Sequence, residues 1–449
     1  MRMKSKTMNM TEGSPVRLLI IFAIPMLIGN IFQQMYNMVD SVIVGKFVGA
    51  DALAAVGATG SVSFLFFALC NGLGSGGGIL TAQYFGAGKD ESVKKAIVNS
   101  AYILLFGSVL MGAISFIFAK DLLHMMATPD ELMADSLVYM RMQCVGLPLV
   151  AVYNHVSSML RALGDSKTPL YFLIFSCILN AGLDLWLVCG FHMGVFGAAL
   201  ATIIAQLIAG MGCMIYAIKY NEYFKMQKEH FKIEKSMLWT TVKLGVPLSL
   251  QFSLIAVSCM ALQRVVNGFG PAVMAAFTAT SRVEQLLHQP YQTLSAALAT
   301  YSGQNLGANK LKRIKLGFHK SMMMMTVFSL VMLPVMQFFG GAIVGLFVDD
   351  AQVIAHGADC MRITSLFYLF LGTIYMTRGV LNGVGDAMFA LINGVVEVIG
   401  RITIPVALTM IPFFGVKGIW WSTGIVWAIS ALFCILRYIS WRRNKNWDY

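Results

Sequence analysis

Twelve apolar stretches, each about 20 to 30 residues long, recur through the chain with short polar segments between them. They cover residues 15–43, 54–79, 94–119, 136–160, 169–190, 195–218, 239–266, 273–301, 316–347, 355–382, 386–410 and 415–438. As a helix, each is long enough to cross a hydrocarbon core of roughly 30 Å. With 57% hydrophobic and 12% charged residues, the composition excludes a soluble globular domain. The sequence therefore predicts an all-α integral membrane protein with twelve transmembrane helices in a lipid bilayer.

The second half of the chain repeats much of the first. The run GADALAAVGAT at 49–59 recurs as GPAVMAAFTAT at 270–280, and QYFGAGK at 83–89 recurs as QNLGANK at 304–310. A repeat of this length indicates a duplicated domain. Each copy holds six spans, an even number, so we expect two parallel, pseudo-symmetric six-helix lobes. The expected divisions are an N-terminal lobe at 1–220, a partly helical cytoplasmic linker at 221–237 and a C-terminal lobe at 238–449.

Basic residues gather in alternate loops, and this distribution is more informative than the net charge of +12. About 25 of the 33 lysines and arginines fall on one side of the predicted spans, including Arg2, Lys4 and Lys6. The positive-inside rule then places both termini in the cytoplasm. No small-residue cleavage site follows the first apolar stretch, so we expect a retained span. The charge reflects topology and does not indicate a nucleic-acid partner.

Sequence motifs for several other functions are absent. The eight cysteines form no CxxC pair, which argues against a zinc site and a disulfide framework. The chain contains no Walker loop, nucleotide fingerprint or HExxH motif. Its loops leave little room outside the membrane for a separate enzyme domain. We therefore expect no cofactor.

Four oxygen-bearing side chains of the first copy are expected to meet within the membrane. Asp40 lies about 15 residues past Pro25 on the first span, and Asp184 lies about 15 residues past the start of the fifth. Asn180 lies one turn before Asp184 on the same helix face. Thr202 lies about eight residues inside the outer end of the sixth span. Polar side chains at this depth are costly and usually functional.

The second copy lacks these acids, because Asp40 falls opposite an apolar run near Ala261 and Asp184 falls opposite Pro405. Two carboxylates, an amide and a hydroxyl form an all-oxygen set that suits a hard cation such as Na⁺. Two nearby carboxylates in a poorly hydrated site also repel each other, so the same pocket suits a proton. H⁺ and Na⁺ remain alternatives, as does a structural role in which each acid caps a backbone group or faces a wet vestibule.

Three residues near this set have both a functional and a structural interpretation. Pro25 favours a kink, which would let the first span bend when Asp40 gains or loses charge. Pro247 occupies nearly the matching position in the second copy, so an architectural role is also consistent. Tyr36 and Asn37 lie close to Asp40 in sequence, and they either line the same cavity or pack.

The second copy carries charges of its own within its apolar stretches, namely Arg264, Arg282, Glu284, Arg378, Glu397 and Arg401. We expect Arg282 to pair with Glu284. Glu397 and Arg401, four residues apart on one helix, form a second expected pair. Structural ion pairs are the favoured interpretation of these residues, with a functional role left open.

Several segments together carry a resemblance to a known family. They are the run IPMLIGNIFQQMYNMVDSVIVGKFVGADALAAVGAT at Ile24–Thr59, the turns YFGAGK and NLGANK, LRALGDSKTP at Leu160–Pro169, and NAGLDLWLV at Asn180–Val188. These segments resemble MATE multidrug and toxic compound extrusion transporters, and within that family the bacterial DinF-type branch. The likeness spans nearly the whole chain, and the combination is more specific than any one segment.

The resemblance implies two six-helix lobes around a V-shaped central cavity that opens alternately inward and outward. It implies a multidrug efflux antiporter, not an enzyme, that exports cationic or amphipathic organic compounds in exchange for H⁺ or Na⁺. The cation site of the DinF-type branch maps onto Asp40, Asn180, Asp184 and Thr202. Tyr36 and Asn154 match positions of the same lobe's cavity. We expect a monomer in the bacterial inner membrane.

Three other functions are weighed against this one. A lipid-linked saccharide flippase of the same superfamily would need cationic side chains for a pyrophosphate, and Arg264, Arg282 and Arg401 keep it open. An intramembrane enzyme has one loose candidate dyad, His155 with Ser157 or Ser158. A passive channel fits less well, because two lobes with acids in only one of them favour alternating access.

Overall fold

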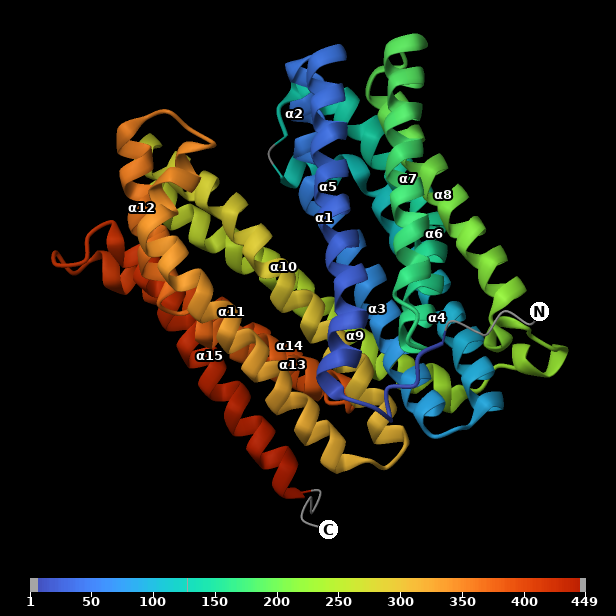
Figure 1. Cartoon of the computed structure of the whole chain (residues 1–449). Coiled ribbons are helices and arrows are strands. Elements are labelled where there is room, and N and C mark those ends of the chain that lie inside the picture. Colours follow the sequence, from blue (N-terminus) through green and yellow to red (C-terminus); the bar gives the residue numbers. More distant parts are fainter. Residues whose placement is uncertain (1–6, 127, 445–449) are drawn as a thin grey trace. The chain divides into compact units, whose positions relative to one another are not determined.

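The structure of the chain is a computed structural model that describes residues 7–126 and 128–444. Within these residues helices make up most of the chain and no strand occurs (Figure 1). The predicted all-α fold class is therefore confirmed. Arg2, Lys4 and Lys6, on which the predicted sidedness partly depends, lie outside the described residues.

Each predicted span coincides with helix. The first copy and the linker contain α1 (Pro15–Phe47), α2 (Ala50–Ala58), α3 (Gly60–Gly86), α4 (Asp90–Ile117), α5 (Ala119–Met125), α6 (Asp130–Ala162), α7 (Lys167–Asp184), η1 (Leu185–Gly190), α8 (Gly194–Tyr220), η2 (Glu222–Phe224) and η3 (Lys228–Phe231). The second copy contains α9 (Lys235–Asn267), α10 (Pro271–Gly307), α11 (Leu311–Gly345), α12 (Ala351–Ser365), α13 (Tyr368–Gly383), α14 (Ala387–Thr409) and α15 (Lys417–Asn444).

Ten helices in the described part of the chain are long and apolar enough to cross a membrane. An eleventh span results if α12 and α13, which meet at a bend of 55°, form one broken span. The remaining predicted span is α10, a helix of 37 residues. Polar side chains near its centre, such as Gln285, His288 and Gln289, lower its mean hydropathy. One predicted span is therefore broken and another is unusually polar.

The repeated turns QYFGAGK and QNLGANK end their helices in the same way. Gly88 after α3 has φ 67°, and Asn309 after α10 has φ 56°. The next residue closes the helix in each case. The Lys89 amide donates to the Tyr84 carbonyl at 3.1 Å, and the Lys310 amide donates to the Asn305 carbonyl at 2.8 Å. This is the Schellman arrangement, which needs a residue that tolerates the left-handed region. Glycine and asparagine both do, which explains the difference between the copies.

Two compact units make up the chain, and the first comprises Met1–Met10 and Ile24–Leu250. Its core is centred on α6, which packs against α3, α4 and α8. Buried side chains such as Leu104, Met140 and Leu147 fill the space between these helices. The start of α9 also belongs to this unit: a Cβ added to Gly76 would lie 2.5 Å from the backbone nitrogen of Gly245. Only glycine permits this close approach.

The second compact unit comprises Thr11–Ala23 and Gln251–Tyr449. In it α10 packs against α11 and α13, and α15 packs against α13 and α14. Large aromatic side chains, including Trp420, Trp427 and Tyr291, are fully buried in its core. The hydroxyl of Tyr291 meets that of Ser329 at 2.7 Å, which satisfies a buried polar group.

The units divide within two helices and not in the linker. The divisions lie between Ala23 and Ile24 in α1, and between Leu250 and Gln251 in α9. Both helices contain a proline close to the division, Pro25 in α1 and Pro247 in α9. A proline removes a backbone hydrogen bond from a helix and weakens it locally. The boundaries of the compact units thus differ from those of the predicted lobes. The division into functional lobes stays a prediction.

Candidate functional site

The first compact unit brings the four predicted ligand residues and Tyr36 together. α1 supplies Tyr36 and Asp40, one turn apart, and α7 supplies Asn180 and Asp184, also one turn apart. α8 supplies Thr202. A four-residue spacing places both members of each pair on one face of their helix. Because α7 packs along α8, the polar faces of the helices can meet.

The hydroxyl of Thr202 joins three helices. It lies 3.2 Å from the Tyr36 hydroxyl, 3.4 Å from Nδ2 of Asn180 and 3.1 Å from the carbonyl oxygen of Ala198. A threonine hydroxyl has one proton and two lone pairs. Since its proton goes to the Ala198 carbonyl, Tyr36 and Asn180 both donate to Thr202. The directions of these hydrogen bonds are therefore fixed.

The carboxyl groups of Asp40 and Asp184 lie close enough to interact electrostatically. A hydrogen bond between two carboxyls needs a proton on one of them. Asp184 is only 1% exposed and Asp40 is half-buried, so water screens the interaction between the two carboxyl groups only weakly. Oδ1 of Asp40 is buried and has no hydrogen-bond partner among the described residues. The pair can therefore hold a proton between its carboxyls and still offer an oxygen to a ligand.

Every atom of this group that could bind a cation is an oxygen, because the Asn180 amide would bind through its carbonyl oxygen while its nitrogen donates to Thr202. The described residues contain no group of three or more His, Cys, Asp or Glu side chains that could hold a metal ion. Two carboxylates, a hydroxyl and an amide carbonyl instead match the preference of a hard monovalent cation or of a proton.

Two polar residues of α6 adjoin the carboxyl pair and were missed from the sequence. Tyr139 is 6% exposed and lies close enough to Asp40 and Asp184 to interact electrostatically with both. The side chain of Gln143, one turn further along α6, accepts a hydrogen bond from Ser63 at 2.6 Å. The available signal was the four-residue spacing of Tyr139 and Gln143 within an apolar stretch, although a lone tyrosine there is typical of a packed core.

A π-helical turn, η1, follows Asp184 directly. In such a turn the backbone hydrogen bonds skip one more residue than in an α-helix, which is uncommon and occurs often at functional sites. The change of geometry begins at Leu185, so Asp184 is the last residue with regular α-helical geometry. Nothing in the residue pattern of NAGLDLWLV predicted this feature.

Three predicted site residues lie apart from the hydrogen-bonded group. Asn37 is exposed, and its backbone carbonyl accepts from Ser41 at 2.8 Å. The side-chain amide of Asn154 donates to the carbonyl of Val150 on its own helix at 3.0 Å. Pro25 is buried within α1, which continues through it as helix. Their proposed cavity and gating roles stay predictions.

The expected pairing of Glu397 with Arg401 is wrong. Glu397 on α14 pairs with Arg378 on α13, at 2.5 Å between Oε1 and Nη2, and both side chains are buried. Ser430 donates to the same carboxylate at 2.9 Å. Arg401 directs Nη1 to the sulfur of Cys259 on α9, at 3.6 Å. A buried charge takes the partner that packing supplies, which spacing along one helix did not reveal.

The expected pairing of Arg282 with Glu284 is also wrong. Arg282 is exposed, whereas Glu284 has Arg401 as its charged neighbour. Residues two apart on a helix do not face each other, which accounts for the error. Arg264 is exposed as well.

The candidate catalytic dyad on α6 does not form. No hydrogen bond joins His155 to Ser157 or Ser158 in the described structure, and Nδ1 of His155 has no partner there. Ser158 instead accepts from Arg161 at 3.4 Å. The adjacency in sequence therefore carries no catalytic geometry.

Comparison with known proteins gives a consistent result along the whole chain. The family model described as MatE matches residues 25–186 and again residues 247–409. These two matches confirm the predicted duplication. The probable multidrug resistance protein YpnP of Bacillus subtilis is 29% identical over 444 residues, covering 98% of this chain and 99% of that protein. The multidrug export protein MepA of Staphylococcus haemolyticus is 24% identical, covering 97% and 96%.

Solved structures show the same fold. A crystal structure of MATE in complex with MaL6 matches with a TM-score of 0.91 and 21% identity, covering 98% of this chain and 100% of that chain. An outward-facing multidrug resistance MATE family transporter of the MOP superfamily matches with a TM-score of 0.90 and 22% identity, covering 99% and 98%.

Proposed function

This chain belongs to the MatE family of membrane transporters, and from this premise we propose that it is a multidrug efflux antiporter. It exports cationic or amphipathic organic compounds in exchange for an inward flow of H⁺ or Na⁺. The names of its relatives YpnP and MepA, which are a probable multidrug resistance protein and a multidrug export protein, support the substrate class. Since the family consists of transporters, the chain is not an enzyme.

One observation carries the coupling part of the proposal, namely the close approach of the carboxyl groups of Asp40 and Asp184. The two residues come from different helices, α1 and α7, so an ion held between them links those helices. When the ion leaves, two like charges face each other in a site with little water and repel. The empty and the loaded site thus favour different separations of α1 and α7.

Alternating access follows if this difference extends to the transporter as a whole. An ion drives the cycle only by binding one state more tightly than the other, because equal affinity for both would shift neither population. Tyr36, Asn180 and Thr202 position the neighbouring oxygens, through the three contacts around the Thr202 hydroxyl. H⁺ and Na⁺ both suit these oxygens, and imposing a gradient of each ion in turn distinguishes them.

The remaining features of the proposal concern the assembly. The functional lobes are residues 1–220 and 238–449 with a linker at 221–237. Asn37 and Asn154 contribute to substrate binding, and Pro25 lets α1 bend. The protein is a monomer in the bacterial inner membrane with both termini in the cytoplasm, as the distribution of basic residues predicts.

Transport by the purified protein in proteoliposomes tests this proposal. A fluorescent organic cation is followed under an imposed pH gradient, an imposed sodium gradient, and no gradient. If the organic cation moves in the direction opposite to the flow of H⁺ or of Na⁺, the result supports antiport and identifies the coupling ion. If neither gradient drives movement, the antiporter assignment fails, and transfer of a labelled polyprenyl pyrophosphate between leaflets would favour the flippase.

A further inference from the structure

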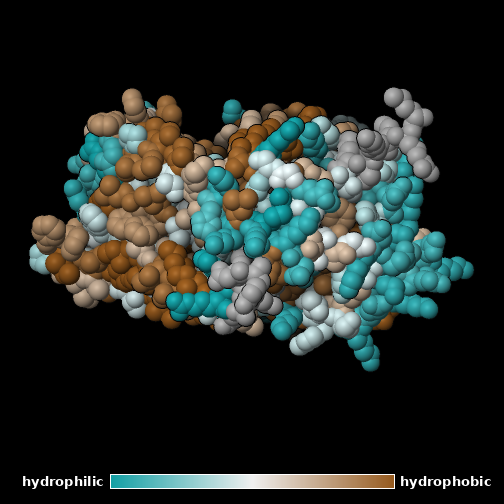
Figure 2. Space-filling view, turned by 60° about the horizontal axis from the view of Figure 1, so that its bottom comes forward, coloured by the Kyte–Doolittle hydropathy of each residue, from teal (hydrophilic) through white to brown (hydrophobic). Residues whose placement is uncertain are grey.

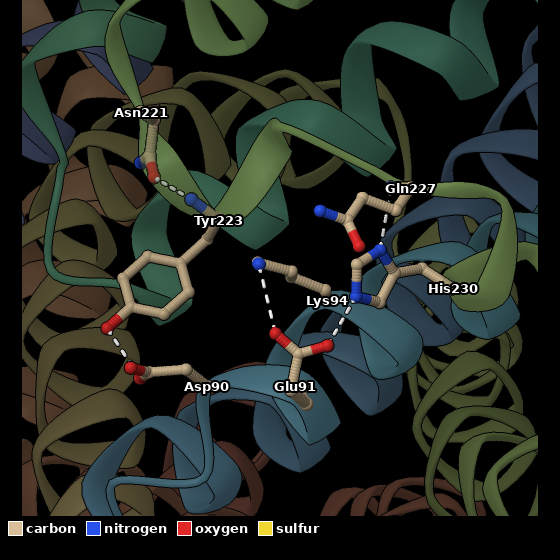
Figure 3. Close-up of polar contacts among 7 residues, drawn as sticks. All are labelled: Asp90, Glu91, Lys94, Asn221, Tyr223, Gln227 and His230. Atoms are coloured by element: carbon tan, nitrogen blue, oxygen red, sulfur yellow. Dashed lines mark hydrogen bonds and ion pairs between the residues drawn. The ribbon is translucent and has the colours of Figure 1, made fainter.

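The segment between α8 and α9, residues 221–234, is fixed to α4 by polar contacts; we call it the connector. Tyr223 donates its hydroxyl proton to Asp90 at 2.9 Å, and Nε2 of His230 lies 2.6 Å from Glu91 (Figure 3). At the start of the connector, Oδ1 of Asn221 accepts a hydrogen bond from the backbone amide of Tyr223 at 3.0 Å. The burial of Tyr223 and its hydrogen bond to Asp90 raise the pKa of Tyr223 to about 12, so it remains a neutral donor.

The ring of His230 is held in one orientation. The backbone amide of Gln227 donates to Nδ1 at 2.7 Å, so Nδ1 carries no proton (Figure 3). Nε2 then carries the proton of the neutral ring and donates to Glu91. Lys94 bonds the other oxygen of the same carboxylate at 3.1 Å. Since His230 is 1% exposed, this contact lies on the inner side of the connector.

The second half of the connector is held in the same way. Glu234 pairs with Lys95 at 2.6 Å, and the Glu234 amide donates to Asn99 at 2.9 Å. Tyr102 donates to the carbonyl of Phe231 at 3.0 Å. The connector is thus attached to α4 along its length, which determines the side chains that face outward.

The outward side of the connector and of the start of α9 carries lysines and large apolar side chains, beside the exposed acids Glu222 and Glu229. We call these lysines and apolar residues the basic-aromatic face, and it comprises Lys225, Lys228, Phe231, Lys232, Ile233, Lys235 and Trp239. Phe231 is 53% exposed, and Ile233 and Trp239 are each 67% exposed. None of its four lysines belongs to an ion pair within the described residues. Figure 2, in which the lower end of Figure 1 comes forward, shows hydrophilic side chains gathered on the right of the view.

The position of this face determines what it meets. The connector joins the ends of α8 and α9, and both helices are long and apolar enough to span a membrane. A segment between two such ends lies at the bilayer surface, at the level of the headgroups. Aromatic side chains favour that level, and exposed lysines there attract anionic lipids. The positive-inside rule assigns a lysine-rich segment to the cytoplasmic leaflet.

We propose that the basic-aromatic face binds anionic phospholipid headgroups of the inner leaflet. The lysines meet the phosphates, while Phe231, Ile233 and Trp239 insert below them. Because the inner side of the connector is bonded to α4, bound lipid also restrains α4 and the start of α9. This binding site is separate from the acidic pair of the proposed function and does not depend on it.

Native mass spectrometry of the full-length protein, with phosphatidylglycerol and phosphatidylcholine as probes, tests the proposal. In the wild type we expect phosphatidylglycerol to bind more tightly than phosphatidylcholine. Replacing Lys225, Lys228, Lys232 and Lys235 by glutamine should lower the affinity for the first bound phosphatidylglycerol molecule by at least about fivefold. This is the effect expected from losing one lysine at a membrane surface. Phosphatidylcholine binding should not change.

Two control variants separate charge from shape and from location. Replacing the same four lysines by arginine keeps the charge, so phosphatidylglycerol binding should be retained. The exposed Lys46 and Lys120 lie outside the connector, and K46Q/K120Q should bind like the wild type. Equal phosphatidylglycerol affinity in the wild type and the glutamine variant would overturn the proposal. An equal loss in the arginine variant or in K46Q/K120Q would overturn it too, because the effect would then not depend on charge at this face.

Discussion

Replacing Asp40 by asparagine separates the shape of the carboxyl pair from its ability to bind and release an ion. Asparagine has nearly the same size and can still hydrogen-bond Asp184, whose side chain is 1% exposed. We therefore expect the free energy of unfolding to change by no more than about 1 kcal/mol. The variant loses one of the two titratable groups, and with it the repulsion that distinguishes the empty site from the loaded one.

The expected loss of function follows from the driving force. If one proton is exchanged for each substrate cation, a difference of one pH unit supplies about 1.4 kcal/mol. At equilibrium this supports an about tenfold concentration ratio of the substrate across the membrane. Without a proton to exchange, Asp40→Asn should reach a ratio of about one under the same gradient.

The assay is accumulation of a fluorescent organic cation by proteoliposomes, with equal amounts of inserted protein. Asp135→Asn is the matched control, because it makes the same chemical change at an exposed residue of the same compact unit. The control should reach the wild-type ratio. An Asp40→Asn variant that still builds a tenfold gradient would refute the assignment of Asp40 to coupling.

Two further variants test the contacts that surround the carboxyl pair and the core of the second unit. Thr202→Val removes the acceptor of Tyr36, and the initial transport rate should fall about tenfold, which corresponds to the net loss of about one hydrogen bond; an unchanged rate would exclude Thr202 from the site. Glu397→Ala leaves Arg378 buried without its partner, and thermal unfolding in detergent should show that the free energy of unfolding falls by about 3–5 kcal/mol. The exposed Glu131→Ala should cause no comparable loss, and an equally small effect of Glu397→Ala would show that the buried pair is not structural.

Much of the fold could be predicted because a membrane allows few alternatives. Span length, hydropathy and the internal repeat were enough to place every predicted span on helix, although two spans are divided, one between α2 and α3 and the other between α12 and α13. The site could be predicted in part by the same geometry, since residues four apart on α1 and on α7 share a face and counting residues gives their depth. This geometry alone predicts that Asp40 and Asp184 lie at the same depth.

Other features depend on packing between helices, which local spacing does not encode. Glu397 takes Arg378 from another helix in place of Arg401 from its own, because the choice is set by which side chains are buried together. Tyr139 lies near the carboxyl pair from α6, although its neighbours in the sequence are typical of a packed core. The π-helical turn after Asp184 is a backbone feature without a residue signature.

The most direct measurement of the central claim is a count of the protons released when an organic cation binds to the purified protein in weakly buffered detergent solution. If Asp40 and Asp184 hold the coupling proton, the wild type should release about one proton for each substrate bound, and Asp40→Asn should release none. The same release from both proteins would contradict the account, because the proton would then reside elsewhere.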